Sequence, residues 1–348
     1  MLFNLSKIFA FSIFLLALTA GGQSFLGAAD APSGSVQAVA SHDSGTGNFQ
    51  ATLPTHPLNE TRAEWVKRKC VYFFYSPVER LFQHMIFTLP FWGALVLTLL
   101  LERLMPAEKN RKIFSAGFRQ DLVWFLYEPF LNVLVVGTYV TVLEKLHTLY
   151  FPQWTFYGLT QTPAWVRIVL GLLIVDLGYW LQHRINHAVP FLWRLHALHH
   201  SQTELNFFSD FRYHPLEYIV RQTFVSVPFI FLQIDPPVIV AVAIFKDWYS
   251  RFYHGNIRTN LGPLRFVLVT PQSHRVHHSV EQSHHDKNFG AIFSIWDHLF
   301  GTQWKDYSIY PPTGLADDKF QVNGKGAVKN LLKSPWSQMW RRLFQNYK

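Results

Sequence analysis

Long apolar runs separated by short polar segments set the pattern of this sequence. Residues 81–101 carry no charged side chain. At 1.5 Å per residue, a helix of this length would be about 31 Å long, which is the thickness of a bilayer core. Residues 122–143, with Glu128 inside, and residues 164–182, with Asp176 near the inner end, are two further apolar runs. The pattern therefore predicts transmembrane helices within residues 81–182.

The region after the third run holds two shorter apolar stretches. They occupy residues 219–253, on either side of Asp235 and two prolines. Each stretch falls short of the roughly 20 apolar residues that a helical crossing needs. We therefore expect residues 219–253 to form a hairpin that dips into the bilayer.

The two ends of the chain have different patterns. Lys7 precedes the apolar residues 8–20, so residues 1–27 are predicted to be a secretory signal peptide or an uncleaved signal anchor. Residues 28–80 begin as a Ser-, Gly- and Thr-rich linker and continue as a basic, aromatic segment suited to a membrane surface. Residues 316–348 are predicted to be a basic amphipathic tail.

Composition supports a lipid-exposed protein. Of the 348 residues, 49% are hydrophobic, 17% are aromatic and only 15% are charged, whereas soluble domains have about 25% charged residues. This balance argues against intrinsic disorder and against a nucleic-acid partner. The single cysteine, Cys70, excludes an intramolecular disulfide and a metal cage built from thiolates.

Basic residues in the loops predict how the chain crosses the membrane. The loop 102–120 carries five Lys and Arg residues, and the loop 146–163 carries none. Because cytoplasmic loops are enriched in Lys and Arg, we expect 102–120 and everything from His183 onward to lie inside. Five further basic residues between Arg62 and Arg80 would then lie outside, which is the one conflict in this assignment.

Histidine is strongly concentrated in one region. Three clusters, HRINH, HALHH and HRVHH, place their histidines at helical spacings of three or four residues, so each cluster presents its imidazoles on one face. Two single histidines stand in YHPLE and FYHGN. Ten of the 17 histidines thus become candidate metal ligands: His183, His187, His196, His199, His200, His214, His254, His274, His277 and His278.

These ten imidazoles suit a pair of transition metals. Neutral imidazole is a common ligand for such ions, and one ion takes four to six donors. Ten nitrogens would supply two ions with about five each and leave room for an exogenous ligand, which suits oxygen activation. The expected fold is all-α, an integral-membrane helical bundle with a cytoplasmic, histidine-rich di-metal domain at residues 183–315.

Carboxylates that accept a hydrogen bond from the ligating histidines are also expected. The candidates are Asp176, Glu204, Glu217 and Asp297. An equally weighted alternative is that these groups cap helices or pair with nearby arginines. The remaining histidines of this region are assigned ordinary roles: His284 and His285 in a solvated loop, and His298 in the structural framework.

The order of the motifs resembles a known family. HRINH, PFLWRLHALHHS, RYHPLE, YHGN, SHRVHH and NFGAIFSIWDHLFGT follow one another as in the fatty acid hydroxylase/sterol desaturase superfamily of membrane di-iron enzymes. The resemblance covers about residues 85–315. It implies that the metals are two iron ions, that the ten histidines are their ligands, and that Asn288 lies beside the metal centre.

The resemblance further implies O2-dependent oxidation of a lipid C–H bond, by hydroxylation or desaturation, in a fatty acyl, sterol or related lipid. An ether-lipid cleaving monooxygenase of the same family is the main alternative. A zinc hydrolase is less well supported, because zinc sites use three or four protein ligands and HExxH is absent. A metal carrier would place its ligands along a pathway within the bilayer, rather than past the end of a span.

Monooxygenation also needs two electrons from outside the substrate. The chain has no GxGxxG dinucleotide motif, no haem attachment motif and too few cysteines for an iron–sulfur cluster. We therefore expect an external electron donor, a ferredoxin or a cytochrome b5 with its reductase. Such donors are acidic, so the basic surface after Lys305 would attract one on the cytoplasmic face.

Overall fold

The computed structural model describes residues 89–234 and 236–316, which belong to one compact unit, residues 73–348. Across these residues the regular structure is helical, with three isolated β-bridges and no strand. This confirms the all-α prediction. The predicted signal segment, the linker, the start of the first span and all but the first residue of the tail lie outside the described residues.

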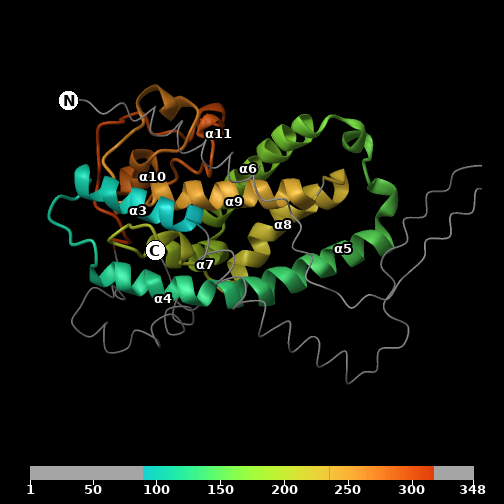
Figure 1. The fold of residues 1–348 in the computed structure, drawn as a ribbon, viewed down its shortest axis with the longest axis horizontal. Helices are drawn as coiled ribbons and strands as arrows, with labels where there is room; N and C mark the ends of the chain where they lie inside the picture. The colour runs from blue at the N-terminus through green and yellow to red at the C-terminus, as the bar shows by residue number, and fades with distance from the viewer. Residues whose placement is uncertain (1–88, 235, 317–348) are drawn as a thin grey trace, which may run out of the picture. The chain divides into compact units, whose positions relative to one another are not determined.

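The apolar runs form long helices (Figure 1). The first helix, α3 (Leu89–Leu104), covers the second half of the first predicted span. Helix α4 (Ala116–Leu131) continues through a π-helical turn, η2 (Asn132–Gly137), into α5 (Thr138–Tyr150). The turn follows Pro129, whose missing N–H removes one α-helical hydrogen bond.

The third run forms helix α6 (Ala164–Ala188), which passes the predicted end of the span and includes the whole HRINH cluster. Residues Ala116–Tyr150 and Ala164–Ala188 are the two stretches of described helix that are long and apolar enough to cross a membrane. They match the second and third predicted spans. The connection between them lies at the end of α6 opposite to α10 and α11 (Figure 1).

The predicted hairpin is a pair of helices, α8 (Pro215–Leu232) and α9 (Pro236–Tyr253). Gln233 ends α8 in a left-handed conformation, with φ of 50°. Both helices pack against α6. The approach of α8 to α6 is very close at Gly178, where an added Cβ would lie 2.6 Å from the Phe224 carbonyl oxygen.

Short elements carry the remaining histidines. Proline starts both α7 (Pro190–His200) and α10 (Pro271–His277), and the latter also has a capping box from Thr270 and Ser273. Helix α11 (Ile295–Leu299) follows. The other described elements are 3₁₀ turns: η3 (Pro152–Trp154), η4 (Gly158–Gln161), η5 (Ser209–Phe211), η6 (Gly262–Phe266) and η7 (Gln282–His284).

Two apolar clusters hold these helices together. One joins α3 and α4 to α7 and η5 through Trp124 and several phenylalanines, among them Phe125 and Phe211, which meet edge to face. The other joins α6, α8 and α9 through residues such as Val175, Phe229 and Val242. Large aromatic side chains around the α5–α6 connection stay exposed instead, among them Trp154, Tyr157 and Trp165. Exposed Trp and Tyr at this position are typical of a membrane–water interface.

A buried ionic network fastens the segment after α7 to α4. Asp121 is fully buried, and its Oδ1 accepts a hydrogen bond from Arg212 Nε at 2.9 Å. Its Oδ2 accepts from Asn206 and Ser209 at 2.9 and 2.8 Å. A buried carboxylate is stable only when it is paired and hydrogen-bonded. This network therefore fixes the path of the chain immediately after the HALHH cluster.

Candidate metal centre

Nine of the ten predicted histidines converge in two adjacent groups. The nitrogens that each group offers to a metal lie within 4.8 Å of one another. His200 of one group stacks on His278 of the other, with ring centroids 4.4 Å apart. The five-histidine group is His183, His187, His196, His200 and His277, and the four-histidine group is His199, His254, His274 and His278.

The Nε2 atoms point inward in both groups. In the five-histidine group, His200 Nε2 lies 3.2 Å from the Nε2 atoms of both His187 and His196. In the four-histidine group, His274 Nε2 lies 2.9 Å from that of His254 and 3.1 Å from that of His278. With metal–nitrogen bonds of about 2.0–2.1 Å, donors on one ion lie about 3–4 Å apart. The spacing of these atoms therefore fits one ion in each group.

The opposite ring nitrogens of several histidines are held by the surrounding protein. His183 Nδ1 donates to the Phe289 carbonyl at 3.0 Å, and His277 Nδ1 donates to the Lys287 carbonyl at 2.8 Å. His254 Nδ1 donates to the Ser250 carbonyl at 2.7 Å. A donor at Nδ1 leaves Nε2 unprotonated and ready to bind a metal.

Two carboxylates complete this outer layer of contacts. Glu217 Oε1 accepts from His196 Nδ1 at 2.7 Å and from Asn186 Nδ2 at 3.0 Å. An Asp286 oxygen lies 3.4 Å from His187 Nδ1, and its side chain is 72% exposed. The protein therefore orients His196 through a buried carboxylate and His187 through a surface carboxylate.

Burial keeps the imidazoles neutral. Desolvation, together with the neighbouring histidines, holds the pKa values of His199, His200, His274 and His278 well below the usual 6.5. Neutral imidazole is the form that binds a metal. No proton has to be displaced from these side chains at neutral pH before an ion can enter.

The structure does not bring His214, the tenth predicted ligand, into either group. His214 is the residue before α8, and its Nδ1 accepts a hydrogen bond from the Leu216 backbone N–H at 3.2 Å. Its position is that of a helix N-cap. A single histidine next to a proline gives no sequence signal that separates these two roles.

The predicted carboxylates divide into one that contacts a histidine of the two groups and three that have other partners. Glu217 contacts His196, as described above. Asp176 accepts from the backbone N–H groups of Ile292 and Phe293 at 2.7 and 3.0 Å. Glu204 accepts from the Gly117 N–H at 2.8 Å.

Asp297 and Asn288 hold the segment that carries the Phe289 carbonyl. Asp297 accepts from the N–H groups of Phe289 and Gly290 and from Trp180 Nε1, at 2.8–3.0 Å. Asn288 donates to the Ser273 carbonyl at 2.8 Å. Asp297 therefore supports His183 indirectly, through the backbone that receives its hydrogen bond.

One prediction outside the ligand set is wrong. His284 is buried, with 4% of its surface exposed, rather than solvated in a loop. Its Nδ1 lies 2.9 Å from Ser279 Oγ, and its ring packs on Trp304. Its neighbour His285 is exposed, as predicted.

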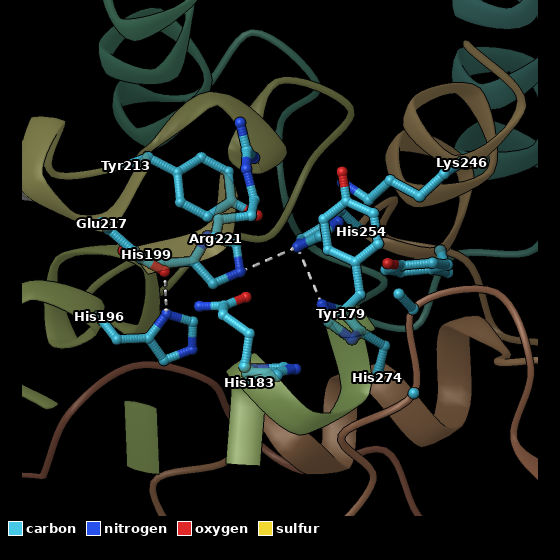
Figure 2. Close-up of a pocket in the computed structure, with 14 residues that line it drawn as sticks. Tyr179, His183, His196, His199, Tyr213, Glu217, Arg221, Lys246, His254 and His274 are labelled. Carbon is cyan, nitrogen blue, oxygen red and sulfur yellow. Dashed lines mark hydrogen bonds and ion pairs between the residues drawn. The ribbon is translucent and has the colours of Figure 1, made fainter. Parts of the chain in front are cut away.

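A small cavity opens beside the two groups (Figure 2). It has a volume of about 40 Å³ and is bordered by histidines of both groups, including His183, His196 and His274. Tyr213 closes one side and stacks on His199 at a centroid distance of 5.1 Å. A space of this size holds a few non-hydrogen atoms next to the two histidine groups.

Comparison with known proteins agrees with this geometry. A family model for the fatty acid hydroxylase domain matches residues 168–302, a range that includes every histidine of both groups. The chain is 28% identical over 268 residues to an ornithine lipid hydroxylase from Rhizobium tropici, covering 74% of this chain and 77% of that protein. No solved structure shows a significant match.

Two further relatives cover different shares of their own length. The human alkylglycerol monooxygenase is 34% identical over 176 residues, which are 46% of this chain but only 38% of that enzyme. A cholesterol 25-hydroxylase-like protein from Danio rerio is 24% identical over 226 residues, covering 63% of this chain and 86% of that protein. The match over residues 168–302 and the lipid hydroxylases and monooxygenases among the relatives show that the chain carries a fatty acid hydroxylase domain, as its motifs predict.

Proposed function

We propose that this chain holds two iron ions and uses O2 to oxidise a C–H bond of a membrane lipid, by hydroxylation or desaturation. The observation that carries the proposal is the convergence of nine buried or half-buried imidazoles in two adjacent groups. No carboxylate or thiolate among the described residues joins either group. Such an all-nitrogen donor set suits iron, copper or zinc, and the family relationship favours iron.

The five-histidine group and the four-histidine group would each hold one ion. When bound, the iron pair supplies the binding and reductive activation of O2 that attack on an unactivated C–H bond requires. The protein holds the donor nitrogens in place and keeps water out. The cavity beside His183 and His274 offers the space in which a reacting carbon would meet the metals.

The reaction needs an electron source and a membrane orientation. Hydroxylation combines RH, O2, two electrons and two protons to give ROH and water. The two electrons would come from a ferredoxin or a cytochrome b5 with its reductase. We place the histidine groups, and hence the docking site of this donor, on the cytoplasmic side, because the loop 102–120 is basic and the loop 146–163 carries no Lys or Arg.

Cleavage of an ether lipid is the second candidate. The human relative with 34% identity is an alkylglycerol monooxygenase. Hydroxylation of the carbon next to an ether oxygen gives a hemiacetal, which breaks down to an aldehyde and an alcohol. The same metal centre would serve this reaction, so the two candidates differ in substrate rather than in ligand set.

The test is reconstitution of the full-length protein in lipid nanodiscs after expression with iron. Lipid extracts from the source membrane are supplied with ¹⁸O2, NADPH, ferredoxin and ferredoxin reductase, and the products are analysed by mass spectrometry. We expect either one ¹⁸O atom in a lipid product or a desaturated lipid two hydrogens lighter. A loaded protein that gives neither product, nor an aldehyde from an ether lipid, would contradict the proposal.

A further inference from the structure

Two cations border the cavity next to the histidine groups. Arg221 of α8 and Lys246 of α9 both line it, together with the phenol rings of Tyr179, Tyr213 and Tyr253. Figure 2 shows them around the same space as His199 and His254. An imidazole site for cations is a poor electrostatic setting for two further positive charges.

Arg221 is held by aromatic rings. Its guanidinium lies over Tyr213 at 5.2 Å and over Tyr218 at 4.5 Å. Its Nε is buried and has no hydrogen-bond partner among the described residues. The Nε–H is therefore available to a ligand, and a guanidinium matches the oxygens of a phosphate or carboxylate.

Lys246 is also directed at this space. It is 4% exposed, and its ammonium lies 4.9 Å from the centre of the Tyr179 ring. Asp247 approaches at 3.3 Å, but 37% of that carboxylate's side chain is exposed. Asp247 therefore offsets the lysine from the surface side. The buried Asp210, whose Oδ1 accepts from Ser250 Oγ at 2.6 Å, is a second carboxylate that acts on Lys246.

The nearby carboxylates are engaged in other contacts, including Asp210, which accepts from Ser250 and Tyr213. Glu217 lines the cavity, but its Oε1 is taken by His196 and Asn186, and its Oε2 has no partner among the described residues. Asp176 is taken up by the segment 292–296. The described cavity lining thus holds two cations and one carboxylate.

The place of the two cations in the fold points to a lipid. Arg221 lies seven residues into α8, and Lys246 lies eight residues before His254, so both lie on the hairpin side of the histidines. Charged residues in such a position are costly and mark substrate sites. The apolar cluster of α6, α8 and α9 begins directly beside them, since Tyr179 and Ala291 belong to both cluster and cavity.

We propose that Arg221 and Lys246 bind an anionic group of the lipid substrate, a phosphate or a carboxylate, and hold the oxidised carbon within a few bonds of that group. The inference rests on the proposed function and names its substrate class. A cavity of about 40 Å³ has no room for an acyl chain. It accommodates the polar end and the reacting carbon, while the chain extends along the apolar helices.

The test measures binding by the iron-loaded, full-length protein in phosphatidylcholine nanodiscs. The probes are radiolabelled hexadecyl phosphate and hexadecanol, which share one alkyl chain, and binding is counted above empty nanodiscs. We expect hexadecyl phosphate to bind about tenfold or more tightly, and Arg221→Gln or Lys246→Gln to remove most of that preference. Arg221→Lys should retain part of it.

Arg265→Gln is the matched control, because Arg265 is also stacked between two rings, Phe266 and Tyr307, and lies outside the cavity. Iron content is measured in every variant. If either Arg221→Gln or Lys246→Gln misfolds and loses its iron, the remaining one of the two provides the test. Equal binding of both probes to the wild type, or an unchanged preference in an iron-loaded R221Q or K246Q protein, would overturn the inference.

Two further measurements are needed. The first distinguishes a lipid ligand from a free phosphate, and the second distinguishes failure of anion binding from failure of the proposed function. Soluble glycerol 3-phosphate should compete poorly, and competition as strong as that of hexadecyl phosphate would contradict a lipid ligand. Oxidation of membrane lipid is measured in the same preparation. If wild-type protein oxidises lipid without any preference for the anionic probe, the inference fails and the proposed function stands.

Discussion

The two histidine groups lie side by side but are supported differently. In the five-histidine group, four outer nitrogens have partners outside the group: Phe289, Asp286, Glu217 and Lys287 supply them. In the four-histidine group, the Nδ1 atoms of His199, His274 and His278 have no hydrogen-bond partner among the described residues. His254 is held by the Ser250 carbonyl.

Because of this difference, the two groups would not bind their ions equally. More donors and more fixed ring orientations favour tighter binding and a closed coordination sphere. The four-histidine group has fewer of both, so its ion would be the more weakly held and would have more open positions. We expect the exogenous ligand to enter on that side.

The largest expected effect comes from removing one ligand in each group. His196→Ala should lower the iron content from two ions per chain to one, and His274→Ala should do the same, with lipid oxidation falling to background in both. Each substitution removes a donor nitrogen and disturbs the ring contacts around it. Metal analysis and the nanodisc assay measure both effects. Full activity in either variant would refute its ligand role.

The same two variants test which group holds its ion more tightly. His274→Ala retains the five-histidine group, and His196→Ala retains the four-histidine group. We expect the remaining ion of His274→Ala to resist a chelator longer, because more donors and more hydrogen-bonded imidazoles hold it. Iron release under a fixed chelator concentration gives the ranking. Faster release from His274→Ala would reverse the comparison.

A smaller effect is expected from the buried carboxylate of the five-histidine group. Glu217→Gln weakens the hydrogen bond to His196 Nδ1 and should reduce metal affinity or activity by about 10- to 100-fold, as is typical for such partners. Glu204→Gln is the control, because Glu204 binds the Gly117 N–H instead of a histidine. An equal loss in both variants would indicate a general folding defect.

The smallest effect is expected at the surface carboxylate. Asp286 is 72% exposed and lies 3.4 Å from His187. Solvent-exposed ion pairs contribute little free energy, so Asp286→Asn should lower metal affinity less than about fivefold. Glu281→Gln serves as the control, since it alters a surface carboxylate beside His284, outside both groups. A loss as large as that of Glu217→Gln would mean that the two contacts are equally important.

The helical fold and the histidines of the centre could be predicted because both depend on spacing. Apolar runs of bilayer length predicted the α4–α5 and α6 stretches, and intervals of three and four residues predicted which imidazoles share a face. His214 and His254 each stand alone in the sequence, so spacing cannot distinguish them. The same reasoning therefore predicts both as ligands. In the structure His214 is at the start of α8, outside both groups.

The outer layer of the site could be predicted only in part. The carbonyls of Phe289, Lys287 and Ser250 accept from the histidines, and a carbonyl is present at every residue, so no residue type signals it. Asp176 lies two helical turns before His183, which looks in sequence like a histidine partner. Its actual partners are 116–120 residues away along the chain, at Ile292, Phe293 and Trp296, a contact that helical spacing does not encode.

We propose above that the two adjacent imidazole groups form one di-iron centre. The most direct test is the iron content of the purified, full-length wild-type protein after expression in iron-rich medium, measured as ions per chain by mass spectrometry of the metal. We expect two iron ions per chain. A content of one or none, in protein that is folded and embedded in its membrane mimic, would contradict it.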